Sequence, residues 1–192
     1  MIASVQGILQ SIGPDHVVVQ VGGVGLQVQV PSSALDSLGL VGSQVALQTF
    51  LVIRDDAVTL YGFPTSEEKR LFELLVGVNG VGPKLALSAL SVMSAEQAAV
   101  AIVSGNVDAL IRVPGVGRRT AGRIVLDLQA RMEQEWGIPV AVAQSAHGEL
   151  AAALGALGYS PGEIQSVVPD LGDLSELSLE EQVRQALRRL AG

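Results

Sequence analysis

Three basic residues stand in places where helices seldom carry positive charge. Lys84, Arg118 and Arg119 come directly after glycine-rich turns, at the start of stretches with helical periodicity. The N-terminus of a helix is the positive end of its dipole, so acids rather than bases are favoured there. The unpaired backbone N–H groups of a first turn, together with a cationic side chain beside them, can bind a phosphate group. These residues therefore predict a clamp for an anion, and their repetition points to function.

The turns before these cations are two copies of one pattern. The first copy reads Val78-Asn79-Gly80-Val81-Gly82-Pro83-Lys84-Leu85-Ala86, and the second reads Val113-Pro114-Gly115-Val116-Gly117-Arg118-Arg119-Thr120-Ala121. Corresponding positions are 35 residues apart, which indicates an internal duplication. Each copy is typical of a helix-hairpin-helix, in which glycines allow the turn between two helices.

Such hairpins suit contact with the sugar-phosphate backbone, which carries no sequence information. A single copy could be a turn that merely packs, but two copies with matched cations favour binding. We therefore expect sequence-independent DNA binding. The candidate DNA-binding residues are Asn79, Gly80, Val81, Gly82, Lys84, Gly115, Val116, Gly117, Arg118, Arg119, Thr120 and Arg123.

The distribution of charge supports the same site. The net charge of −7 alone argues against a nucleic-acid partner. However, residues 1–62 carry −3 and residues 137–192 carry −4, whereas residues 78–123 carry +3. A basic island in an acidic chain is a sign of an anionic ligand at that island. The island coincides with the repeat.

Composition excludes several other classes. The chain has no cysteine, which excludes disulfides, thiolate catalysis and cysteine-based zinc sites. His16 and His147 have no partner ligands nearby in the sequence, so we expect no metal site. No apolar run is long enough to span a membrane, and the first residues lack the pattern of a signal peptide. We expect a cytoplasmic protein without a membrane partner.

Residues 1–63 read as a β-barrel. Apolar or alternating runs separated by turn signals predict five strands, at Ile2–Ile12, His16–Val21, Leu26–Val30, Val45–Ile53 and Val58–Tyr61. This number and length suit an OB fold. Because only Phe50 and Tyr61 could stack bases, we expect a scaffold or oligomerisation role for the barrel. Between the last two runs, Asp55 and Asp56 predict a tight exposed tip, for which the residues alone favour a solvated turn.

Residues 64–136 read as helical and contain both hairpins. Capping boxes at Thr65–Glu68 and Ser94–Gln97 predict two helix starts, and Asn106 can cap the short helix before the second hairpin. Gly122 lies inside the last of these helices, where glycine costs up to about 1 kcal/mol relative to alanine. Close approach of another backbone would be one reason for it.

Residues 137–147 read as a flexible linker, and residues 148–192 as a small three-helix bundle. The bundle helices are expected at Glu149–Leu157, Pro161–Val168 and Ser178–Leu190. We expect the bundle to dock to a protein, with Leu171, Leu174, Leu179, Val183 and Leu187 as candidate partner-binding residues. The fold class expected for the whole chain is multidomain α+β.

With these parts in order, the chain resembles the RuvA family, the DNA-binding subunits of Holliday junction branch migration complexes. The two hairpin segments are the most specific match. Val21-Gly22-Gly23-Val24-Gly25, Leu60-Tyr61-Gly62-Phe63 and Ala156-Leu157-Gly158-Tyr159 agree as well. The family often has lysines after the second hairpin, and Arg118 and Arg119 keep their charge.

The resemblance implies a non-catalytic subunit that binds four-way junctions by their structure and holds them open. It implies a flat homotetramer, with a face-to-face octamer as the open alternative. Asp55 and Asp56 would form an acidic pin that repels phosphates near the junction centre. The C-terminal bundle would contact RuvB, a hexameric ATPase motor, and the junction resolvase RuvC is a further candidate partner. No cofactor is implied for this chain, because the motor uses the ATP.

Two enzymatic functions are alternatives. A DNA glycosylase or nuclease can also hold DNA with helix-hairpin-helix turns, and Asp127 is the acid that closely follows the second hairpin. Aromatic residues to stack a flipped base are nearly absent, however, and no acid cluster suggests a two-metal site. Nucleotide hydrolysis at Gly77–Lys84 is excluded, because Leu85 stands where a Ser or Thr must hold Mg²⁺.

Overall fold

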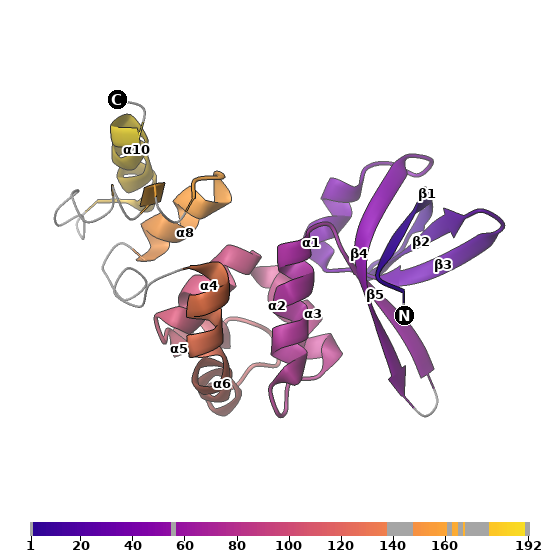
Figure 1. Cartoon of the computed structure of the whole chain (residues 1–192), viewed down its shortest axis with the longest axis horizontal. Helices are drawn as coiled ribbons and strands as arrows, with labels where there is room; N and C mark the ends of the chain where they lie inside the picture. The colour runs from indigo at the N-terminus through magenta and orange to yellow at the C-terminus, as the bar shows by residue number, and fades with distance from the viewer. Residues whose placement is uncertain are drawn as a thin grey trace. The chain divides into compact units, whose positions relative to one another are not determined.

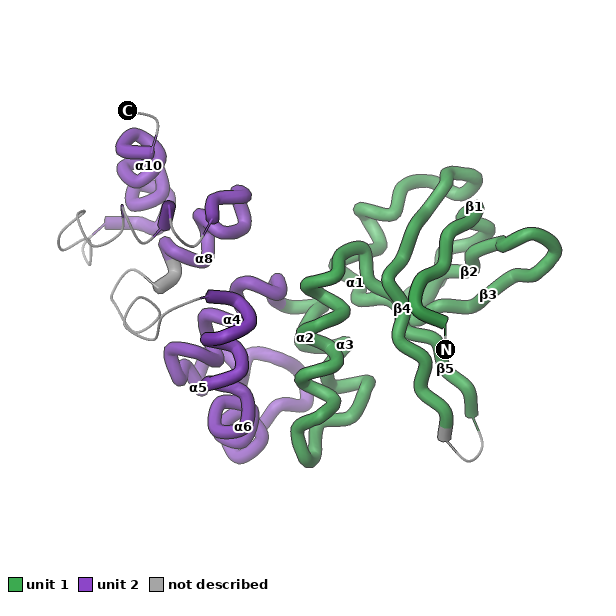
Figure 2. Tube along the Cα trace, viewed as in Figure 1, with its two compact units in different colours: residues 1–92 green, residues 93–192 purple. Residues whose placement is uncertain are grey.

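The computed structural model describes residues 2–54, 57–137, 148–160, 163, 164, 167 and 177–190 (Figure 1). Packing divides the chain into two compact units, residues 1–92 and 93–192 (Figure 2). The first unit contains the barrel and the first hairpin, and the second contains the second hairpin and the C-terminal helices. The division into 1–63, 64–136, 137–147 and 148–192 stays a prediction, and Gly137 is the one linker residue within the described ranges.

The N-terminal strands form a closed barrel. They are β1 (Ser4–Ile12), β2 (His16–Val21), β3 (Val24–Gln29), β4 (Gln44–Arg54) and β5 (Ala57–Phe63). The order around the barrel is β1-β2-β3-β5-β4, with antiparallel pairing except between β3 and β5. Alternate apolar side chains point inward, and Leu9, Val17 and Val19 have no exposed surface. The predicted OB-type barrel is confirmed.

A short helical segment follows β3, where the sequence indicates only a turn. It consists of α1 (Ser32–Leu35) and a 3-10 turn at Asp36–Leu38. The Ser33 hydroxyl donates to the Leu90 carbonyl at 2.8 Å, and the Ser32 N–H donates to the Ser91 hydroxyl at 3.0 Å. Both acceptors belong to α3 (Pro83–Val92), so this segment ties the barrel to the helix that follows the first hairpin.

Helix α2 (Ser66–Gly77) is held on the barrel by one aromatic side chain. Phe72 is fully buried, and its ring centre lies 4.9, 5.0 and 5.7 Å from those of Phe63, Tyr61 and Phe50. The barrel aromatics are therefore packed against a helix instead of being displayed for stacking bases. The scaffold or oligomerisation role of the barrel stays a prediction. The predicted cap is also present, because Thr65 accepts the Glu68 N–H at 3.2 Å.

The second unit begins with α4 (Ala95–Val103), α5 (Val107–Ile111) and α6 (Arg118–Trp136). The predicted caps of α4 and α5 are confirmed. Ser94 and Gln97 form a reciprocal capping box with distances of 3.2 and 3.0 Å, and Asn106 accepts the Ala109 N–H at 3.0 Å. Helix α6 packs on α4 and α5. Its buried face is made by Ala121, Ile124, Leu128 and Met132.

The C-terminal helices share a small core of their own. Helices α8 (Gly148–Ala156) and α10 (Leu179–Leu190) bury Leu150, Leu154 and Ala186 together with Ile164 and Val167. Of the expected middle helix at 161–168, residues 163, 164 and 167 are described, and all three are helical. Within the described residues, the C-terminal part of the chain is therefore built from helices, as predicted.

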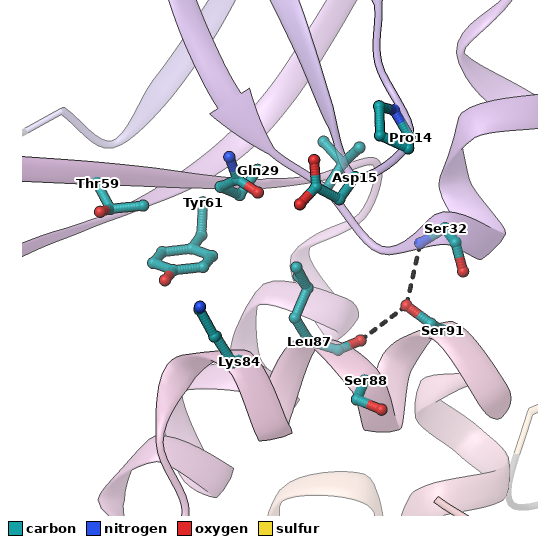
Figure 3. Close-up of a pocket in the computed structure, with 11 residues that line it drawn as sticks. Pro14, Asp15, Gln29, Ser32, Thr59, Tyr61, Lys84, Leu87, Ser88 and Ser91 are labelled. Carbon is teal, nitrogen blue, oxygen red and sulfur yellow. Dashed lines mark hydrogen bonds between the residues drawn. The ribbon is translucent and has the colours of Figure 1, made fainter. Parts of the chain in front are cut away.

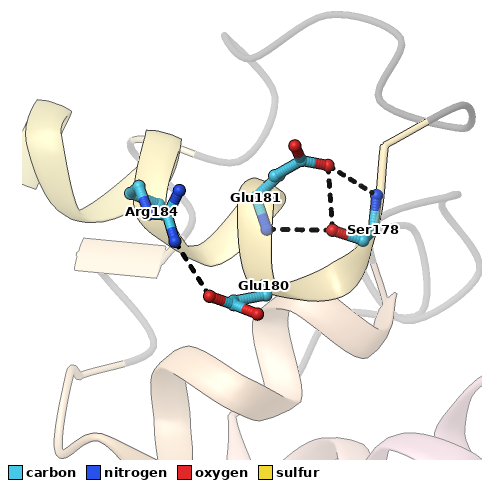
Figure 4. Close-up of polar contacts among 4 residues, drawn as sticks. All are labelled: Ser178, Glu180, Glu181 and Arg184. Atoms are coloured by element: carbon cyan, nitrogen blue, oxygen red, sulfur yellow. Dashed lines mark hydrogen bonds and ion pairs between the residues drawn. The ribbon is translucent and has the colours of Figure 1, made fainter.

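A capping box starts α10 (Figure 4). The Ser178 hydroxyl accepts the Glu181 N–H at 3.4 Å and donates to the Glu181 carboxylate at 2.9 Å. One turn into the helix, Arg184 lies 2.8 Å from Glu180. Ser160 and Glu163 form a similar pair, and hydrogen bonds from the Ser160 hydroxyl and N–H lower the pKa of the Glu163 carboxyl. Caps of this kind can be recognised in a sequence, because the two partners lie three residues apart.

Candidate nucleic-acid interface

The first hairpin is a tight turn held by its own backbone. Gly80 has a φ of +89°, a conformation that side chains with a Cβ resist. The Val81 N–H donates to the Val78 carbonyl at 3.0 Å, and the Val81 side chain is only 5% exposed. The chain then enters α3, whose first intrahelical bond joins the Ala86 N–H to the Gly82 carbonyl at 3.0 Å. The turn therefore points an apolar side chain inward and the helix start outward.

The second hairpin repeats this geometry 35 residues later. Gly115 has a φ of +88°, and the Val116 N–H donates to the Val113 carbonyl at 3.0 Å. The Val116 side chain is 6% exposed. Helix α6 begins with a bond of 2.9 Å from the Ala121 N–H to the carbonyl of Gly117, its N-cap. The repeat that the sequence predicts is thus a repeat of individual hydrogen bonds.

Both helix starts leave backbone N–H groups without a partner inside the helix. In α3 the groups that precede the first helical bond belong to Lys84 and Leu85, because Pro83 has no N–H. In α6 they belong to Arg118, Arg119 and Thr120. An anion at either start would meet these donors and the positive end of the dipole together. Leu85 was missing from the residues predicted for this site.

The predicted DNA-binding residues differ in how they are placed. Val81 and Val116 are buried and use their N–H groups within the turn, so they shape the hairpin. Arg123 lies one helical turn beyond Arg119 on α6. The exposed members are Asn79, Gly80, Lys84, Gly115, Gly117, Arg118 and Arg119, and the half-buried members are Gly82, Thr120 and Arg123.

Lys84 stands beside a cavity of about 520 Å³ between the barrel and α3 (Figure 3). Its side chain points toward the ring of Tyr61, with Thr59 and Gln29 nearby on the barrel wall. The opposite wall is formed by Leu87, Ser88 and Ser91 of α3. The cation that follows the first hairpin therefore lines a cavity shared by its own helix and the barrel.

The three cations at the helix starts differ in their partners. Within the described ranges, neither Lys84 nor Arg119 forms an ion pair with an acid. The Arg118 guanidinium, in contrast, lies 2.8 Å from the carboxylate of Asp108 on α5. Both side chains of this pair are largely exposed, at 76% and 79%. Sequence reasoning counted Asp108 only as a charge and did not place it in the site.

Gly122 has no close backbone neighbour outside its own helix among the described residues. A Cβ built at Gly122 would meet nothing within 4 Å there, so the close approach suggested as one reason for this glycine is not found in that part of the chain. We expect Gly122→Ala to raise the free energy of unfolding by about 0.5–1 kcal/mol, because alanine favours the helix. Denaturant unfolding measures this. A loss of stability would reveal crowding that the structure does not contain.

The other predicted site residues are only partly described. Asp55 and Asp56 lie outside the described residues, between Arg54 of β4 and Ala57 of β5, which pair with each other. Leu171 and Leu174 also lie outside them. On α10, Leu179 is 41% exposed, whereas Val183 and Leu187 pack against the C-terminal core. Partner binding stays a prediction, with Leu179 as its most accessible described residue.

In the described part of the chain, no group of three or more histidine, aspartate or glutamate side chains is placed to hold a metal ion. No single described helix is long and apolar enough to cross a membrane, and α3 and α4 pass that test only when counted together.

Matches to known proteins cover nearly the whole chain. Family models described as the RuvA N-terminal domain, a SAM-like helix-hairpin-helix tandem and the RuvA C-terminal domain match residues 1–62, 72–130 and 145–191. A Holliday junction branch migration complex subunit RuvA from Dehalococcoides mccartyi is 43% identical over 97% of both chains. The subunits of that name from Chloroflexus aurantiacus and Pseudomonas putida are 44% and 37% identical, over 98% of this chain and 97% and 98% of theirs.

The matches to these relatives extend over nearly the full length of both chains, and the family models match the barrel, the hairpin region and the C-terminal helices of this chain. The chain therefore belongs to the RuvA family.

Proposed function

We propose that this protein binds four-way DNA junctions by their structure and holds them open for branch migration. The observation that carries the proposal is the repeated clamp: two hairpins with matching φ angles and hydrogen bonds, each followed by an exposed cation at a helix start. Each clamp contacts backbone phosphates, so affinity depends on salt and not on base sequence. The relatives, named as subunits of a Holliday junction branch migration complex, support this substrate.

A gel-shift titration tests the proposal directly. The purified protein is mixed with a four-way junction and with a linear duplex of equal length, at the same salt concentration. We expect much tighter binding to the junction, and equal affinity for junctions of unrelated sequence. Equal affinity for duplex and junction would contradict the proposed selectivity for four-way junctions.

We propose further that the chain has no catalytic activity of its own and needs no cofactor. Support comes from the site residues, which are backbone donors, glycines and cations with no paired nucleophile and base. Asp127, the acid considered for a glycosylase or nuclease, lies nine residues along α6 from Arg118. Incubation with damaged or branched DNA and Mg²⁺ should leave the DNA intact. Released base or cut strands would favour the enzymatic alternative.

The proposal includes assembly with other chains. Four subunits in a ring would match four DNA arms, and a face-to-face octamer is the alternative assembly. The C-terminal helices would recruit the hexameric ATPase RuvB, with exposed Leu179 as one contact, and RuvC would act on the same junction. Light scattering of the free and junction-bound protein distinguishes tetramer from octamer.

The proposed acidic pin gives a separate prediction. We expect Asp55→Asn with Asp56→Asn to raise affinity for linear duplex roughly 5-fold, because each carboxylate repels a phosphate at ~8 Å by about 0.5 kcal/mol in water. The ratio of junction affinity to duplex affinity should therefore fall in the gel-shift titration. Asp36→Asn with Glu67→Gln removes the same charge from exposed positions outside the proposed pin and serves as the control. If both double variants behave alike, Asp55 and Asp56 are only a solvated turn.

A further inference from the structure

The two clamps differ in one respect that the repeat makes visible. Arg118 occupies the position that corresponds to Pro83 of the first copy, so the second helix start has one extra cation. That extra cation is the one whose guanidinium lies 2.8 Å from Asp108. Lys84 and its counterpart Arg119 form no such pair among the described residues. The second hairpin therefore has both an extra cation, Arg118, and an acid that pairs with it, Asp108.

The acid has a counterpart in the first copy as well. Asp108 corresponds to Glu73, whose carboxylate lies 4.0 Å from Lys69 and 3.7 Å from Arg70 on its own helix α2. The positions that correspond to these two cations in the second copy are Ser104 and Gly105. Asp108 therefore lacks the basic neighbours that hold Glu73, and it reaches across the hairpin to the clamp helix instead.

We propose that Asp108 lowers the affinity of the second hairpin for the DNA backbone. Its carboxylate pairs with the Arg118 guanidinium and so competes with a backbone phosphate for that cation. With Asp108 in place, Arg118 and Arg119 contribute one net positive charge, which equals the contribution of Lys84 at the first hairpin. This inference rests on the proposed DNA-binding function. It makes Asp108 a positioning residue that sets how strongly the hairpin holds phosphate, without contacting DNA itself.

A purely structural role for the ion pair is disfavoured by its surroundings. Both partners are mostly exposed, and exposed ion pairs stabilise a fold very little. The hairpin is already fixed by the buried side chains of Leu110, Val113 and Val116 and by the bond from Val116 to Val113. The pair is also easily exchanged, since a phosphate can replace the carboxylate as the partner of the guanidinium fork.

The experiment compares the wild type, Asp108→Asn and Asp127→Asn by salt-dependent titration with a four-way junction and a linear duplex. Asp127→Asn removes the same charge from the exposed surface of α6 and is the matched control. We expect Asp108→Asn to bind both DNAs about threefold to tenfold more tightly at ~0.1 M salt, with a steeper salt dependence, because each gained phosphate contact adds ~0.9 to the slope. Asp127→Asn should stay close to the wild type.

The same change in an Arg118→Ala background shows whether Asp108 acts through Arg118. There the gain from Asp108→Asn should fall to that of Asp127→Asn. A gain of equal size in both backgrounds would show direct repulsion of DNA and overturn the inference, as would Asp108→Asn binding no more tightly than the control. If the wild type bound no DNA, the proposed function would fall and this inference with it. Wild-type binding with an unchanged Asp108→Asn overturns the inference alone.

Discussion

Replacing Lys84 and Arg119 together by alanine should weaken binding to four-way junctions by at least about 100-fold at ~0.1 M salt. Each side chain is exposed at a helix start and would make a charge-assisted hydrogen bond to a phosphate. Such bonds contribute roughly 1.5–3 kcal/mol each, and about 2.7 kcal/mol corresponds to 100-fold in affinity. The loss should be the same for junctions of any sequence, and the salt dependence should flatten.

The control for this variant removes two cations outside the clamps. Arg131→Ala with Arg184→Ala gives the same net charge, and both residues lie in exposed helix-surface pairs, 3.8 Å from Glu135 and 2.8 Å from Glu180. This control should retain most of the affinity, as should the charge-conserving Lys84→Arg. An equal loss in the control would show that net charge, and not the clamp, governs binding. A loss that varied with base sequence would contradict backbone recognition.

The features that the sequence predicts well are local ones. The five strands follow from alternation and turn residues, and the caps at Ser94 and Asn106 follow from residues three positions apart. The hairpins were predictable because each turn is closed by hydrogen bonds between residues three apart, and because the pattern occurs twice. Because these structures depend on residues close together in the chain, the two hairpins could be predicted from the sequence alone.

The features that the sequence does not show depend on contacts between distant residues. Helix α1 was missed, since its ties to α3 join residues 57 and 59 positions apart. Asp108 was missed because its partner lies ten residues away, across a turn. The sequence does contain an indication that Asp108 needs another partner. Alignment of the two copies pairs Asp108 with Glu73, and the basic neighbours of Glu73 are replaced by Ser104 and Gly105 in the second copy.

The barrel aromatics are a similar case with a larger consequence. Their scarcity argues against base stacking, which stays a prediction, and nothing in the sequence shows that three of them converge on Phe72. Helix α2 leads directly into the first hairpin, and Leu75 and Val78 at this junction are each 3% exposed. We therefore expect the barrel to orient the first hairpin through this packing, and not to contact DNA through these rings.

The convergence on Phe72 makes it the position where a core change should cost most. We expect Phe72→Ala to lower the free energy of unfolding of the first unit by about 3–5 kcal/mol, the usual range for emptying a buried aromatic site. Phe72→Leu keeps most of the volume and should cost less than about 1.5 kcal/mol. Hydrogen exchange resolved by residue separates the first unit from the second, whose protection should not change.

The same variant tests whether the cluster orients the hairpin. At temperatures where Phe72→Ala remains folded, exchange of the Val81 N–H should accelerate, because α2 and the turn lose their anchor on the barrel. The Val116 N–H, which has the same bond in the second unit, is the internal reference. Equal acceleration at both valines would indicate global unfolding, and no change at Val81 would show that the hairpin holds its shape independently of the barrel. Faster exchange at Val81 alone is the result that ties the barrel to the first clamp.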